Sequence, residues 1–197
     1  MKKRIMAIMS LVIMATATTA CGSDKSKETT TELTATEDTT TGQTTQAENG
    51  ETGMVDPWIF VASSTDAAEG AGVGYFMVPE DGMSLDGGEV HMYGFKYMEG
   101  IAEADGSVGA AEITIRKGLK QDTEDVSGDY NEYSFEWTVE TEDWEVKCYG
   151  NEEGKTMKAI WLSDNFSYSI AIRGQGDLYD TYGLGDDDIK KLVTAIQ

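Results

Sequence analysis

The chain has 197 residues, and its 36 acidic side chains outnumber its 15 basic ones, so the formal net charge is −21 at pH 7. A surface this acidic repels nucleic acids and anionic lipid head groups, which argues against both as ligands, and it attracts cations or basic partners. One histidine, His91, and two cysteines, Cys21 and Cys148, are too few for an ordinary structural zinc site.

The chain begins with the composition of a secretory signal peptide. Residues 1–4 are positively charged, residues 5–15 form an apolar run, and small uncharged residues follow. The apolar run is too short to span a bilayer, which takes about 20 residues. The sequence Thr-Ala-Cys-Gly at 19–22 resembles the lipobox of bacterial lipoproteins, with Cys21 as its cysteine, although Thr18 stands where Leu or Val is usual.

The lipobox resemblance implies that residues 1–20 are removed and that Cys21 becomes a lipidated N-terminus. A diacylglycerol thioether on this cysteine, with further acylation, would hold the protein at the extracytoplasmic face of the cell membrane, because each buried methylene contributes about 0.8 kcal/mol. The alternative is an ordinary secretory signal followed by an incidental cysteine.

Residues 21–54 are expected to be a disordered tether. Eleven of the residues 22–54 are Thr and none is aromatic, so this stretch cannot bury enough apolar surface to offset its ordering entropy. All aromatic residues lie after position 54, and residues 55–197 are long enough for one domain with a core of its own. With 29 acidic and 10 basic side chains, this domain carries a formal charge of −19.

The apolar pattern after position 54 predicts a helix near each end of the domain and strands between them. Alternating apolar and polar residues are typical of half-buried strands, whereas the apolar residues from Ile189 to Ile196 recur at the spacing of one helix face. In chain order we expect an extended segment at 56–61, a helix at 64–69 capped by Asp66, strands at 75–79, 90–97, 110–116, 133–140, 144–149, 156–162 and 166–173, and a closing helix from Asp186.

Strands in succession with helices at both ends predict an α+β fold. We expect a single curved antiparallel β-sheet packed on one face by a short N-terminal helix and a C-terminal helix. The alternation places Cys148 on an apolar strand face, as a small buried residue. It also puts His91, Tyr93, Phe95 and Tyr97 on one face of a strand, and Tyr133, Phe135, Trp137 and Val139 on one face of another. Alternating aromatic residues of this kind most simply form the core. The alternative is that Tyr93, Phe95 and Tyr97, with Phe135 and Trp137, line a groove for a glycan or an apolar ligand.

Several stretches, at 112–117, 125–133 and 159–172 and in the closing helix, resemble a domain of unknown function from Firmicute lipoproteins and membrane-anchored proteins. That domain is related in layout to lipoprotein-sorting and sigma-regulator sensor domains. The resemblance implies an extracytoplasmic α+β domain with no established activity. The segment 175–182 is an insertion relative to that pattern.

Candidate catalytic groups are few. A Ser–His–Asp or Cys–His arrangement would have to use His91, and no serine stands in a nucleophile elbow. Carboxylate pairs that could hydrolyse sugars will occur by chance among so many acids, but none stands out. We therefore expect neither enzymatic activity nor a cofactor.

Two acidic clusters contain enough oxygens to be weak candidates for calcium, which takes six to eight oxygen ligands. Neither has EF-hand spacing, and both also suit a solvated loop or a helix N-terminus, so no metal is assigned. The first cluster is Asp122, Glu124, Asp125 and Asp129, with Asn131 beside them; the second is Asp177, Asp180, Asp186, Asp187 and Asp188.

From these observations we expect a non-enzymatic, lipid-anchored protein of the cell envelope. Its domain would bind another envelope protein or act as a sensor-like module. The alternative is a lipoprotein that binds or carries a small ligand, either apolar or a glycan.

Overall fold

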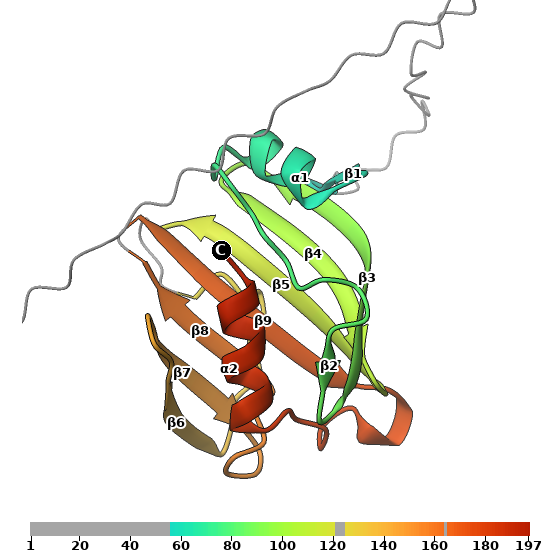
Figure 1. The fold of residues 1–197 in the computed structure, drawn as a ribbon, viewed down its shortest axis with the longest axis vertical. Helices are drawn as coiled ribbons and strands as arrows, with labels where there is room; N and C mark the ends of the chain where they lie inside the picture. The colour runs from blue at the N-terminus through green and yellow to red at the C-terminus, as the bar shows by residue number, and fades with distance from the viewer. Residues whose placement is uncertain (1–55, 121–124, 164) are drawn as a thin grey trace, which may run out of the picture. The chain divides into compact units, whose positions relative to one another are not determined.

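The structure, a computed structural model, describes residues 56–120, 125–163 and 165–197, which belong to one compact unit. The signal peptide, Cys21 and the tether lie outside the described residues. The described strands form one open antiparallel sheet in the order β1-β3-β4-β5-β9-β8-β7-β6, and β2 pairs with β3 (Figure 1). The predicted α+β class is thereby confirmed.

The elements are β1 (Ile59–Val61), α1 (Ser64–Ala71), β2 (Ser84–Leu85), β3 (Gly88–Met98), β4 (Ile101–Val108), β5 (Ala111–Leu119), β6 (Phe135–Glu140), β7 (Glu145–Gly150), β8 (Lys158–Leu162), β9 (Phe166–Gly174), a 3-10 turn η1 (Gly176–Leu178) and α2 (Asp186–Ala195).

Helix α2 crosses one face of the sheet, which we call the inner face (Figure 1). Its apolar stripe from Ile189 to Ile196 is buried, as the sequence spacing predicts, and joins one cluster with the isoleucines of β5 and β9. Gly185 is the N-cap, and three aspartates follow in the first turn, where carboxylates suit the positive end of the helix dipole. The core thus lies between the central strands and α2.

Helix α1 packs at the far end of the same face, against β3 and β4. Ser63, and not the expected Asp66, is its N-cap: the backbone N–H of Asp66 donates to Ser63 Oγ, which donates in turn to the Asp66 carboxylate. The cap therefore lies one turn earlier than predicted, because a hydroxyl accepts from an N–H three residues on. Gly70 lies against the Tyr97 ring, where an added Cβ would come within 2.4 Å of ring atoms.

Strand β4 was not predicted, although it is a central strand. Its inner-face residues are small, and Ala102 and Ala104 are fully buried. Its other face carries Glu103 and Asp105, and both residue types are uncommon in strands. Because the only large apolar side chains of β4, Ile101 and Val108, stand at its two ends, the segment lacks the alternation by which strands are recognised.

Strand β3 differs from the prediction because of a β-bulge between Met92 and Gly94. Phe95 pairs with Ala104 on the inner face, whereas His91, before the bulge, pairs with Ser107 on the opposite, outer face. The expectation that His91, Tyr93, Phe95 and Tyr97 share one face is therefore wrong. An extra residue in a strand reverses the alternation beyond it.

Two further expectations differ locally. Residues 75–79 are extended but form no assigned strand; Met77 instead exchanges two backbone hydrogen bonds with Gln197 at the C-terminus. Tyr133 precedes β6, and its ring lies beside that of Tyr149 on the outer face, with 6.5 Å between ring centroids and a tilt of 40° between ring planes. It therefore does not share a face with Phe135 and Trp137.

Candidate ligand-binding groove

Strands β7 and β8 separate at one end, and a groove opens between them. Their pairing runs from Tyr149 with Lys158 to Lys147 with Ile160 and stops there. Both strands nevertheless continue, β7 to Glu145 and β8 to Leu162, each still paired with its other neighbour. The groove between the two parted ends has a volume of about 710 Å³, within the range of roughly 300–1,000 Å³ that small-ligand pockets occupy.

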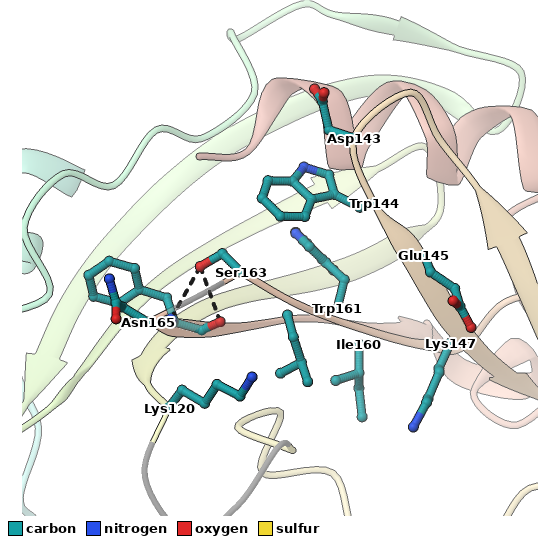
Figure 2. Close-up of a pocket in the computed structure, with 11 residues that line it drawn as sticks. Lys120, Asp143, Trp144, Glu145, Lys147, Ile160, Trp161, Ser163 and Asn165 are labelled. Carbon is teal, nitrogen blue, oxygen red and sulfur yellow. Dashed lines mark hydrogen bonds between the residues drawn. The ribbon is translucent and has the colours of Figure 1, made fainter.

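The floor and walls of the groove are apolar. Ile160 and Trp161 are buried, and Trp144, Leu162 and Phe166 are partly exposed beside them. Figure 2 shows the Trp144 and Trp161 side chains near one another; Trp161 lies on β8, and Trp144 directly precedes β7. Aromatic side chains such as these offer large rigid contact surfaces to a ligand.

The two walls are held by local hydrogen bonds and by stacking. Trp161 stacks on Tyr168 of β9, with 5.3 Å between ring centroids and 8° between ring planes. Trp144 follows a tight turn in which its backbone N–H donates to Thr141 Oγ1. On the other side, Ser163 N–H and Phe166 O close the β8–β9 turn at 2.9 Å. The groove is therefore largely preformed.

Charged and polar groups form the rim. Lys120 and Lys147 bring two positive charges, Asp143 and Glu145 bring two negative ones, and Asn165 adds an amide; all five residues are exposed. Lys120 is held beside the groove because its N–H donates to Asn165 O at 3.0 Å. In a domain with a formal charge of −19, this rim is close to neutral, so it does not repel an anionic ligand group as the rest of the surface does.

A separate polar layer covers the outer face of β3, β4 and β5. The Glu103 carboxylate is buried between Lys96 and Arg116, and Lys96 Nζ also lies 3.0 Å from Asp105 Oδ2. The Trp58 ring covers both cations, with its centroid 5.4 Å from Lys96 Nζ and 5.1 Å from Arg116 Cζ. The paired charges and the covering indole indicate a structural role.

The described members of the first calcium cluster bind the protein's own groups. Asp125 Oδ2 lies 3.1 Å from Lys158 Nζ. Burial alone raises the pKa of the Asp125 carboxyl, but hydrogen bonds from Ser127 and the charge of Lys158 outweigh burial and lower the pKa. Asp129 is buried and accepts from Tyr133 Oη; burial and this carboxylate raise the pKa of the tyrosine. Asp122 and Glu124 lie outside the described residues.

The second acidic cluster is divided among other partners. Asp188 is buried and accepts the backbone N–H groups of Asp86 and Gly87, and Asp186 accepts from Trp137 Nε1 at 3.0 Å. Across residues 56–120, 125–163 and 165–197, no three His, Cys, Asp or Glu side chains gather in a way that could hold a metal ion.

The other residues singled out from the sequence lie away from the groove. His91 is exposed on β3, with Nδ1 3.1 Å from Asp81 Oδ1. Phe95, Tyr97 and Trp137 pack against the core cluster, whereas Tyr93 and Phe135 are exposed. The aromatic groove expected as an alternative is therefore not built from these five residues. Cys148 is fully buried, which confirms the prediction of a buried core cysteine.

The sequence places most groove residues on strands, and Asp143, Ser163 and Asn165 in the turns between them, but it does not reveal a site. One signal was present: the run Ala-Ile-Trp-Leu at 159–162 is apolar on both faces, so one of these faces needs a cover other than the core. The parting of β7 from β8 leaves no trace in the local sequence. In the described part of the chain, no helix has the length and apolar character needed to cross a membrane.

Comparison with known proteins gives no relative: no family model, curated protein or solved structure matches the sequence.

Proposed function

We propose that this chain is a non-enzymatic binding protein of the cell envelope, anchored through a lipid on Cys21, and that its domain captures a ligand in the groove between β7 and β8. The observation that carries the proposal is the parting of two paired strands around a groove of about 710 Å³ that is lined by two indoles. A sheet normally closes such a gap, since unpaired strand ends and exposed apolar walls both cost stability. Their persistence here supports a role in binding.

The rest of the domain supports binding more than catalysis. The buried charges of the outer face are paired with one another, as Glu103 is with Lys96 and Arg116, and His91 stands at the surface away from the groove. The groove contributes two lysines, two carboxylates and two indoles. Such a set orients a ligand by charge and apolar contact.

The groove contains its own reporter, because Trp144 and Trp161 line it. The test is a titration of the full chain with Cys21→Ser against a panel of short peptides, oligosaccharides and solubilised lipids, followed by tryptophan emission. We expect at least one class to shift the emission saturably. Trp144→Ala should weaken that binding, whereas Phe60→Ala, which removes a 72% exposed aromatic ring on β1, should not. If no class binds, or if Phe60→Ala weakens binding as much as Trp144→Ala, the groove is not the binding site.

A further inference from the structure

One residue of β7, Glu145, turns its backbone N–H and C=O toward the groove. Thr141 N–H donates to Trp144 O at 2.9 Å, so the Trp144 peptide groups face β6. In an antiparallel ladder, successive residues direct their N–H and C=O groups to opposite sides. Glu145 therefore directs its backbone groups away from β6, toward β8.

One residue of β8, Leu162, turns its backbone groups toward the groove from the opposite wall. Ser163 N–H donates to Phe166 O, so Ser163 faces β9 and its neighbour Leu162 faces β7. After Lys147 and Ile160, the next pair to face one another in this register would be Glu145 and Leu162, but the pairing ends before it. Both residues line the groove.

We propose that the ligand of this groove is an extended polypeptide segment that pairs its backbone with Glu145 and Leu162. This inference rests on the proposed function and names its substrate class. Glu145 and Leu162 each offer one N–H and one C=O to the groove. An extended chain presents the same donor and acceptor on each residue, directed alternately to its two sides, so two neighbouring residues of a segment could pair with both walls. An acyl chain offers no donor or acceptor of this kind.

The groove walls fit the side chains of an extended segment. Successive side chains of a strand point to opposite faces, and the two faces of the parted sheet differ here. Trp144 and Trp161 project on the inner face, the same face as the core residue Cys148. Lys147 and Ile160 project on the outer face. An apolar side chain of the segment would lie against the indoles, and a polar or charged neighbour would lie beside Lys147.

The experiment begins with a library of random linear peptides of about nine residues, longer than the usual strand of roughly five to six residues, displayed against the full chain with Cys21→Ser. The tightest peptide is then resynthesised with one backbone nitrogen methylated at a time. Methylation removes a donor and leaves the side chains unchanged, so pairing with Glu145 and Leu162 predicts an affinity loss of about tenfold or more at the one or two positions that face these residues, and little loss elsewhere. A peptide whose affinity is unchanged by methylation at every position overturns the inference.

Matched variants of the protein test the same contact from its own side. Glu145→Pro removes the groove-facing N–H and, at the first residue of β7, no ladder donor to β6; Glu145→Ala removes only the carboxylate. We expect Glu145→Pro to lose about tenfold more peptide affinity than Glu145→Ala. Equal losses overturn the inference. Melting temperature checks the fold of both variants, and if Glu145→Pro melts early, the methylation series on the unchanged protein decides.

The outcomes separate this inference from the proposed function. If no peptide is enriched but an oligosaccharide or a lipid shifts the tryptophan emission through Trp144, the groove binds another class and only the present inference is wrong. If no member of any class binds, both are wrong.

Discussion

Lys117 Nζ lies 4.4 Å from the centre of the Phe166 ring, on the sheet face that otherwise forms the core. The Tyr168 ring is 5.2 Å away, and the ammonium group donates to Tyr75 O. The residue is 4% exposed. Burial lowers the pKa of this lysine below its ordinary value, so the carbonyl and the two rings do not fully replace the lost hydration.

Replacing this ammonium group should stabilise the domain. Lys117→Met keeps most of the side-chain volume and removes a desolvated charge, so we expect the free energy of unfolding to rise by about 1 kcal/mol at pH 7, the low end for apolar replacement of buried charges. Tyr75 itself is 60% exposed, and we expect water to reach its carbonyl once the ammonium group is gone. Urea denaturation measures the change, with Lys155→Met as the surface control. A loss of stability in Lys117→Met alone would show that its contacts outweigh burial.

The same lysine predicts a pH dependence. Its folded pKa is lowered from 10.5, so between the folded and unfolded values the unfolded chain binds more protons, and stability rises with pH. The penalty is fully present below the folded pKa and vanishes above about 10.5. The advantage of Lys117→Met should therefore be largest near neutral pH and shrink toward pH 10. An advantage that stays constant up to pH 10 would contradict this account.

The buried carboxylate of Glu103 should be the most sensitive group of the outer face. Its side chain is 2% exposed and pairs with Lys96 and Arg116. Glu103→Gln leaves the two cations without that charge, which should cost about 3 kcal/mol of unfolding free energy. Glu112→Gln, an exposed change on β5 next to β4, is the control and should change stability by less than about 0.5 kcal/mol. Equal effects in urea denaturation would refute a special role for Glu103.

Much of this fold is predictable, and the exceptions have physical causes. The stripe from Ile189 to Ile196 predicts α2, because helix spacing is a local property. Strand β4 is not predictable because its buried face carries the small residues Ala102 and Ala104, which give no apolar alternation. The bulge beside Gly94 inverts the faces assigned to β3. The groove depends on where two strands stop pairing, which is decided by tertiary packing and not by the residues of either strand.

Cys148 should be an unreactive thiol. It is fully buried on β7, and burial, above all, raises its pKa to about 12, so almost no thiolate is present at pH 8. In the full chain with Cys21→Ser it is the single cysteine. A disulfide reagent should label no thiol within minutes in native buffer and one thiol in 8 M urea, an unfolding concentration for most domains. Rapid native labelling would show that β7 opens readily.

The lipid anchor makes its own prediction, independent of the domain. If Cys21 is acylated, the wild-type chain expressed in an exporting bacterium should sediment with membranes and partition into detergent, because two or more acyl chains bind a bilayer stably. Cys21→Ser should shift the protein to the soluble extracytoplasmic fraction while leaving its melting temperature unchanged, since the domain begins more than thirty residues later. Cys148→Ala is the matched control and should stay in the membrane fraction. A Cys21→Ser protein that still sediments with membranes would mean that something other than a lipid on this cysteine holds the chain there.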